Sequence, residues 1–135
     1  MKIDDLHSLF SKSSGISTDT RTIKKNNMFF CLKGGKFDGN LFIEQAFHLG
    51  ASFVIYDDHK LSYKSEKAIK VKNVLKTLQA LAKYHRSKFN IPVIGLTGSN
   101  GKTTSKELIN SVLSQKFNVT FTSNNFNNHI GVPLT

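Results

Sequence analysis

The chain has 135 residues, of which 39% are hydrophobic, and it carries a formal net charge of +10. This length holds one ordinary domain or two small ones, and the hydrophobic content is enough for a packed core, which excludes a disordered chain. The single cysteine, Cys31, excludes an internal disulfide framework, and no apolar run approaches the roughly 20 residues that cross a bilayer.

The excess of basic residues first suggests a nucleic-acid-binding protein, because such charge attracts phosphate backbones without regard to sequence. These residues are spread along the whole chain, however, and form neither a dense basic run nor an aromatic-flanked RNA motif. We therefore expect a solvated, lysine-rich surface and no nucleic-acid partner. The N-terminal stretch MKIDDLHSLF lacks the apolar core of a signal peptide, which together with the single cysteine predicts a cytoplasmic protein.

The first part of the chain predicts alternating helices and strands. Their expected order is helix 3–10, strand 27–32, helix 39–51, strand 52–58, strand 68–71 and helix 74–85. The helix over 39–51 has Gly50 as its stop and presents to the core Phe42, Ile43, Ala46 and Phe47. This order indicates a small α/β domain with a mixed sheet.

A second unit begins near Asn90. The apolar run IPVIGL at 91–96 favours a buried parallel strand, residues 103–117 place hydrophobic residues at helical spacing, and NVTFTS at 118–123 favours another strand. With the glycine-rich turn between them they predict a β-loop-α-β unit, with the loop at the carboxyl end of its first strand, where open α/β sheets bind ligands. Because this is too little sheet for a complete nucleotide-binding domain, we expect a fragment with domains at 1–88 and 89–135.

The turn GLTGSNGKTT, residues 95–104, has the ingredients of a phosphate-binding loop but misses the Walker A spacing, because five residues separate Gly95 from Gly101. A phosphate needs backbone N–H groups at a helix N-terminus, glycines that allow close approach and a lysine at the end of the loop. The alternative is an ordinary turn between a strand and a helix. The residues predicted to bind the nucleotide are Gly98, Ser99, Asn100, Gly101, Lys102, Thr103 and Thr104.

This loop, with its extra residue, resembles the ATP-binding loop of the Mur ligase family and of the related folylpolyglutamate synthetases. Two further stretches are similar to the MurF-type members of the family: STDTR with NNMFFCLKGGKFDGNLFIEQAFHLGA, at 17–21 and 26–51, and NNFNNHIGVPLT, at 124–135. The resemblance covers nearly the whole chain. It implies a UDP-binding amino-terminal domain followed by the first β-loop-α-β unit of a P-loop-like, parallel-sheet ATPase domain.

The resemblance also implies where the UDP end of the substrate binds. Arg21 offers a planar guanidinium suited to a pyrophosphate, while Asp19 is either a cap or a structural partner of that arginine. The segment GGKFDGN favours either a tight ligand loop or a plain turn capped by Asp38 or Asn40. The residues expected to bind the sugar nucleotide are Thr20, Arg21, Lys36, Phe37, Asp38 and Gly39.

An Asn-rich segment near the end of the chain brings several amide donors and acceptors together, as a peptide or sugar site requires. Asn127, Asn128 and His129 are expected to face the sugar-peptide substrate; His129 would ligate, relay a proton or merely cap. Lys102 is the expected catalytic residue, and the hydroxyl of Thr103 or Thr104, with Thr103 preferred, is the expected Mg²⁺ ligand.

By resemblance, the activity is an ATP-dependent amide ligation that adds D-alanyl-D-alanine to UDP-MurNAc-tripeptide through an acyl phosphate, in an enzyme that is monomeric when complete. We expect this chain alone not to ligate, because the groups that hold the amine are absent from it. The alternatives are a MurE-type ligase, a folylpolyglutamate synthetase-like ligase, a P-loop switch or nucleic-acid motor, and a non-enzymatic nucleotide-binding module. The stretch at 17–51 argues against the synthetase, and the loop spacing argues against the switch.

Overall fold

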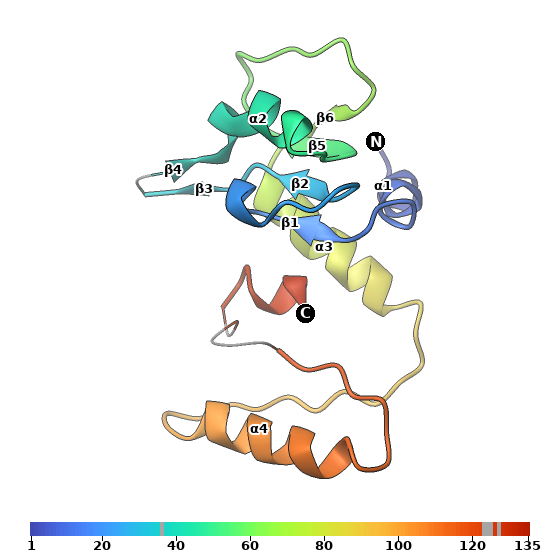
Figure 1. The fold of residues 1–135 in the computed structure, drawn as a ribbon, viewed down its shortest axis with the longest axis vertical. Helices are drawn as coiled ribbons and strands as arrows, with labels where there is room; N and C mark the ends of the chain where they lie inside the picture. Colours follow the sequence, from blue (N-terminus) through green and yellow to red (C-terminus); the bar gives the residue numbers. More distant parts are fainter. Residues whose placement is uncertain (36, 123–125, 127) are drawn as a thin grey trace. The chain divides into compact units, whose positions relative to one another are not determined.

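The computed structural model describes residues 1–35, 37–122, 126 and 128–135. These residues form two compact units, Met1–Arg86 and Ser87–Thr135. Figure 1 shows the helices and strands of each unit.

The first unit alternates short helices and strands, as its hydrophobic spacing predicts. The largest difference from the prediction is that the helix expected over 39–51 forms as a 3₁₀ turn followed by a shorter α-helix. In chain order the elements are α1 (Ile3–Phe10), β1 (Ile16–Ser17), η1 (Thr20–Thr22), β2 (Met28–Phe30), β3 (Lys33–Gly34), β4 (Phe37–Asp38), η2 (Gly39–Phe42), α2 (Ile43–His48), β5 (Phe53–Tyr56), β6 (Ala68–Lys70) and α3 (Val74–Arg86).

The strands of the first unit form two separate sheets, not one mixed sheet. Four strands pair in the order β1-β2-β5-β6, and all three pairings are parallel, with Phe29 opposite Val54 and Ile55 opposite Ile69. The other sheet is a two-stranded antiparallel ribbon of β3 and β4. Because the four main strands are parallel, their carboxyl ends lie along one edge, and the loops that leave this edge carry the polar residues considered below.

Helices cover both faces of the parallel sheet (Figure 1). Successive side chains of β2 and β5 point to opposite faces. Phe29, Val54 and Tyr56 pack with Ile43 and Ala46 of α2 in one buried cluster. The buried side chains of α1 and α3 belong to the other layer; they are Leu6, Val74, Leu78 and Leu81.

The predicted stop of the helix that precedes β5 is confirmed. Gly50 has a φ of +96°, which lies in the left-handed region where glycine is favoured, and its N–H donates to the carbonyl oxygen of Phe47 at 2.9 Å. The carbonyl oxygen of Gly50 in turn accepts from the N–H of Asn26 at 2.8 Å, which ties the helix end to the turn before β2.

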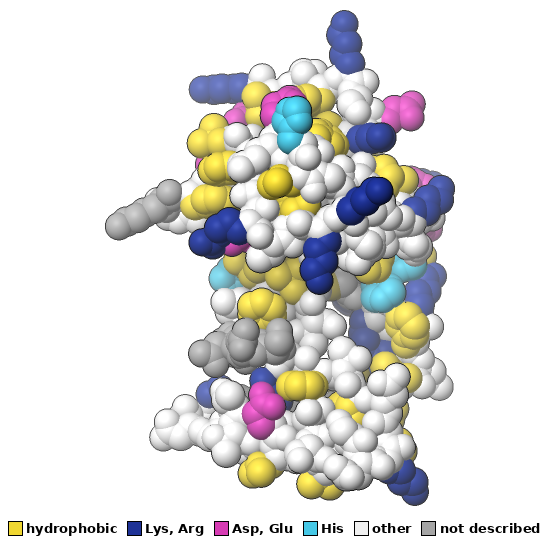
Figure 2. All heavy atoms as spheres, in the orientation of Figure 1, with side chains coloured by type: hydrophobic (Ala, Val, Ile, Leu, Met, Phe, Trp, Pro, Cys, Tyr) yellow, Lys and Arg dark blue, Asp and Glu magenta, His cyan; other side chains and the backbone are white. Residues whose placement is uncertain are grey.

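The second unit has the predicted helix but, among its described residues, no strand. α4 (Lys102–Leu113) follows the glycine loop, and a 3₁₀ turn, η3 (Val132–Leu134), lies near the end. The predictions of strands at 91–96 and 118–123 are therefore wrong for residues 91–96 and 118–122. A strand exists only where a neighbour takes its backbone hydrogen bonds, and an isolated pair is marginal in water. The apolar character of these segments remains visible, since Val93 is 68% and Ile94 61% exposed, and Figure 2 shows hydrophobic side chains at the surface of this unit.

Among the helices that the described residues form, none combines the length and the apolar character needed to cross a membrane.

Candidate functional site

A pocket opens where β1 ends, beside the β3–β4 ribbon. Its volume is about 470 Å³, and its lining residues are Thr18, Asp19, Thr20, Arg21, Phe37 and Phe42. The chain leaves the parallel sheet after Ser17, turns through η1 and presents this polar segment at the carboxyl edge. Three of the residues predicted to bind the sugar nucleotide, Thr20, Arg21 and Phe37, thus lie on one pocket, which is called the edge pocket below.

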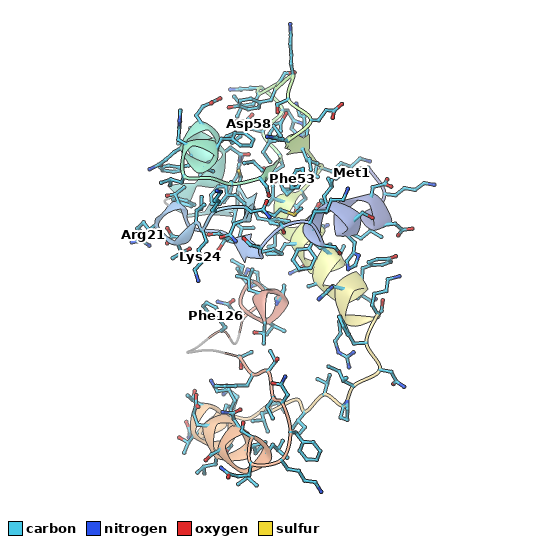
Figure 3. The ribbon with its side chains drawn as sticks, turned by 45° about the vertical axis from the view of Figure 1, so that its right-hand side comes forward. Met1, Arg21, Lys24, Phe53, Asp58 and Phe126 are labelled. Atoms are coloured by element: carbon cyan, nitrogen blue, oxygen red, sulfur yellow. The ribbon has the colours of Figure 1, made fainter. Side chains whose placement is uncertain are left out.

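Asp19 and Arg21 form a tight pair in the edge pocket. The carboxylate of Asp19 accepts from the backbone N–H of Arg21 at 2.9 Å, from its Nε at 3.0 Å and from its Nη2 at 2.5 Å. These hydrogen bonds hold the pKa of Asp19 below its usual value, so the carboxylate stays charged and orients the guanidinium. The side chain of Arg21 is 87% exposed and projects outward from η1 (Figure 3). Asp19 is therefore both a cap and a partner of Arg21, the two alternatives that the sequence left open.

An aromatic pair forms another wall of the same pocket. The rings of Phe37 and Phe42 are stacked, with centroids 5.3 Å apart and planes inclined by 14°. Phe37 is 45% exposed, so its ring offers surface on which a planar group can stack. The hydrophobic spacing placed Phe42 on the buried face of a helix; its part in the pocket depends on the turn at η2, which the spacing does not reveal.

Asp38 and Gly39, both predicted to touch substrate, have structural contacts in the described residues. The carboxylate of Asp38 accepts from the backbone N–H and the side-chain amide of Asn40 at 2.9 and 2.7 Å, and the ammonium of Lys33 lies 3.3 Å away. Gly39 is buried, and a Cβ there would lie 2.7 Å from backbone atoms of Cys31. Neither residue lines the edge pocket, so their contact with substrate stays a prediction. Lys36, the other predicted ligand here, lies outside the described residues.

A buried polar link, which the sequence analysis did not predict, supports this loop. Asn40 is 2% exposed, and its amide donates to Asp57 at 3.3 Å, while its carbonyl oxygen accepts from the N–H of Asp57 at 3.2 Å. Asp57 also accepts from the N–H of Val74 at 3.0 Å, where α3 begins. The turn at η2 is thus fixed to the ends of β5 and α3. An Asn and an Asp separated by many residues, such as Asn40 and Asp57, occur in most sequences, so this pattern could not have predicted the link.

The glycine loop of the second unit has the backbone that an anion-binding turn needs. Gly98 and Gly101 have φ values of +145° and +78°, and Gly101 is the residue that caps α4, without a side-chain cap. The first helical hydrogen bond runs from the N–H of Ser105 to the carbonyl oxygen of Gly101, so the N–H groups of residues 102–104 have no partner within the helix. The ammonium of Lys102 folds back and donates to the carbonyl oxygens of Gly98 and Ser99.

Thr103 and Thr104, which follow the glycine loop, have side chains that are suited to contribute to a Mg²⁺ site. Thr103 and Thr104 are exposed in the first turn of α4, where each offers a hydroxyl oxygen, the ligand type that this hard cation prefers. Within the described ranges, no group of three or more His, Cys, Asp or Glu side chains is close enough together to hold a metal ion. The hydroxyl of Thr103 would thus be at most one of the ligands that such an ion needs.

The Asn-rich segment is described only in part. Asn128 caps the turn that leads to η3: its side-chain oxygen accepts from the N–H groups of Ile130 and Gly131 at 3.0 and 2.8 Å. His129 is exposed. Three asparagines of the predicted substrate segment lie outside the described residues, namely Asn124, Asn125 and Asn127.

Comparison with known families finds two adjoining matches along the chain. Residues 12–86 match the family described as "Mur ligase family, catalytic domain", and residues 96–135 match the "Mur ligase middle domain".

Individual relatives point to the same group of enzymes. The chain is 46% identical over 122 residues to the UDP-N-acetylmuramoyl-tripeptide–D-alanyl-D-alanine ligase of Bacillus subtilis, which covers 90% of this chain and 27% of that enzyme. It is 42% identical over 105 residues to a 2,6-diaminopimelate ligase of Clostridium tetani, covering 74% of this chain and 22% of the relative. The crystal structure of the MurF ligase from Thermotoga maritima in complex with ADP superposes with a TM-score of 0.80 at 31% identity, over 99% of this chain and 29% of that one. The chain thus spans about a quarter of the length of the relatives it matches.

Proposed function

The chain belongs to the Mur ligase family, and we propose that it supplies the UDP-binding and part of the ATP-binding machinery of a ligase that joins D-alanyl-D-alanine to UDP-MurNAc-tripeptide. The single observation that carries the proposal is the glycine loop. Its two left-handed glycines, its uncapped helix start and its lysine occur together in a chain 46% identical to a ligase with that name.

In this proposal the loop binds the phosphates of ATP. The N–H groups of residues 102–104 and the positive end of α4 face the anion, and the ammonium of Lys102 leaves the carbonyl oxygens of Gly98 and Ser99 to contact it. The other loop residues, Ser99, Asn100 and Gly101, approach through their backbone. A bound Mg²⁺, held in part by Thr103, would neutralise charge on the phosphate oxygens.

The edge pocket would bind the UDP end of the substrate. Arg21, held in place by Asp19, offers donors to the pyrophosphate, and Thr20 adds a hydroxyl. The exposed ring of Phe37, backed by Phe42, provides a stacking surface for the base. We assign this role to the predicted domain 1–88, and the start of the ATP-binding domain to 89–135.

The proposed reaction proceeds by two transfers. The γ-phosphoryl group of ATP passes to the terminal carboxylate of the tripeptide, which releases ADP; the amine of D-alanyl-D-alanine then attacks the acyl phosphate, and phosphate leaves as the amide forms. Lys102 and the loop amides stabilise the charge that develops on the transferred group. The chain's single cysteine, Cys31, is buried and unpaired, which supports a reducing compartment such as the cytoplasm.

The test is ligation by the protein that carries this chain, followed as formation of UDP-MurNAc-pentapeptide and phosphate. D-alanyl-D-alanine should be the accepted amine with a UDP-MurNAc-tripeptide, whether its third residue is L-lysine or meso-diaminopimelate. Product formation should require ATP and should be lost in Lys102→Ala but retained in Lys116→Ala, a lysine outside the loop. Use of free diaminopimelate with UDP-MurNAc-dipeptide would instead identify a MurE-type ligase, and use of folate and glutamate a synthetase; either result would refute the proposal.

A further inference from the structure

A second and larger hollow lies on the first unit. Its volume is about 620 Å³, and it is formed where α1 begins, where β6 ends and where α3 begins. It shares no lining residue with the edge pocket, so it is a different place from the proposed UDP site. Ile3, Leu6 and Val71 form an apolar part of its lining.

The charged residues that line this hollow beside its apolar part are all basic. Four of its lining residues are lysines, Lys2, Lys70, Lys72 and Lys76, and none of the chain's nine Asp and Glu residues lines it. Among the salt bridges formed by the described residues, none involves any of these four lysines. Like charges around one depression repel one another, and a bound anion would remove that repulsion. The name "lysine hollow" is used below for this place.

The wall of the lysine hollow is held by hydrogen bonds. The ammonium of Lys70 donates to the carbonyl oxygens of His59 and Leu61 at 3.1 and 2.9 Å, which ties the end of β6 to the loop after β5. Asn73 accepts from the N–H of Lys76 at 2.8 Å, and Asp57 accepts from that of Val74. The start of α3 is therefore already capped, so the attraction for an anion comes from the lysine side chains and not from free helix N–H groups.

We propose that the lysine hollow binds a compact, multivalent phosphate anion, as a free polyphosphate or as the phosphate group of a larger molecule. Its volume is within the range typical of small-molecule sites, roughly 300 to 1,000 Å³. Lysine ammonium groups act as flexible point charges and, unlike an arginine fork, impose no planar geometry. The lysine hollow therefore selects charge more than shape, and affinity should increase from phosphate to pyrophosphate to tripolyphosphate.

The test is a titration of the ¹⁵N-labelled 135-residue chain with each of these three anions at 150 mM salt. Tripolyphosphate should shift the amides of residues 2–6 and 70–77. The double variant Lys72→Gln/Lys76→Gln should weaken this binding about tenfold, since each exposed charge contributes a modest amount. The matched control is Lys64→Gln/Lys67→Gln, which removes the same charge from exposed lysines outside the hollow and should leave the affinity unchanged.

Co-sedimentation with phosphatidylglycerol vesicles at the same salt concentration distinguishes the sources of the phosphate. Sedimentation that Lys72→Gln/Lys76→Gln abolishes would identify a lipid headgroup, whereas tripolyphosphate binding without sedimentation would identify a free anion. Equal weakening by the two double variants would mean diffuse attraction to a basic surface and would overturn the proposal. So would the lack of any shift at residues 2–6 and 70–77 with all three anions, because shifts at Arg21 or at the glycine loop report the two sites of the proposed function and not the lysine hollow. None of these results depends on whether the chain belongs to a D-alanyl-D-alanine ligase.

Discussion

Lys102 is the residue on which the proposed ATP site depends most. Its ammonium donates to two carbonyl oxygens of the loop, so it already lies beside the backbone that the proposal assigns to phosphate binding. Replacing it by alanine removes one charge-assisted contact with phosphate, worth about 1.5–3 kcal/mol. We expect the affinity of the chain for Mg-ADP to fall roughly ten- to a hundredfold in Lys102→Ala, measured by calorimetry. Lys116→Ala should bind as the parent does, and equal loss in both variants would exclude a specific role for Lys102.

Gly39 packs closely against the backbone of Cys31, and substituting it tests how much this packing contributes to stability. Its backbone approaches Cys31 so closely that any Cβ would collide with main-chain atoms at 2.7 Å, and its N–H donates to Leu32 at 2.9 Å. Gly39→Ala should lower the free energy of unfolding by about 1–3 kcal/mol, since the clash involves backbone that cannot move aside freely. Urea denaturation measures this loss. Gly34→Ala, where a Cβ meets nothing within 4 Å, is the control, and a similar cost at both positions would refute the steric explanation.

At the residue scale, the sequence indicates the types of side chain in the site but not their partners. Arg21 and Phe37, singled out from the sequence, both line the edge pocket, while their contact with substrate stays a prediction; the two structural roles left open for Asp19 coexist. The part of Phe42 and the link between Asn40 and Asp57 were not predicted, because both depend on how η2 turns back toward the sheet. Such contacts join residues distant in sequence, and no local pattern encodes them.

At the scale of elements, two histidines join α1 to α3. Nε2 of His7 lies 3.0 Å from Nδ1 of His85, and the rings of Phe10 and Tyr84 pack against this pair. Burial, and then the charge of His7, lowers the pKa of His85 below its usual value of 6.5. The folded chain therefore binds the proton less readily than the unfolded chain.

The sign of the resulting pH dependence follows from that lowered pKa. The stability associated with neutral His85 is complete above pH 6.5 and is lost as the pH falls through the lowered pKa. Urea midpoints should thus decrease between pH 7.5 and 5, and His85→Gln should flatten this decrease. The exposed His48 is the control, since His48→Gln should keep the parent slope. An unchanged slope in His85→Gln would contradict the lowered pKa of His85 as the cause.

Periodicity predicted those elements that bury a face within their own unit. The helices at 3–10 and 74–85 and the strands around Phe29 and Val54 follow the expected spacing, because each packs its apolar side on the parallel sheet. The runs at 91–96 and 118–123 have equally strand-like composition, yet no strand forms in their described residues. Composition shows that a segment is suited to a β-sheet. It does not show whether a second strand is present to pair with it, and without that partner no strand forms.

At the scale of the whole molecule, the two proposed binding sites lie in different units. The edge pocket belongs entirely to Met1–Arg86 and the glycine loop entirely to Ser87–Thr135. The two family matches follow the same division, with residues 12–86 in one and 96–135 in the other. Each unit should therefore bind its own ligand independently of the other.

Amide chemical shifts of the ¹⁵N-labelled chain, titrated separately with UDP-MurNAc-tripeptide and Mg-ADP, test this division most directly. The sugar nucleotide should shift Thr18, Asp19, Thr20, Arg21 and Phe37 and leave residues 98–104 unchanged. Mg-ADP should do the reverse, with the largest shifts at the N–H groups of residues 98–104, where the glycine loop meets α4. If both ligands shift the same residues, or if Mg-ADP leaves the glycine loop unaffected, the assignment of the two sites is contradicted.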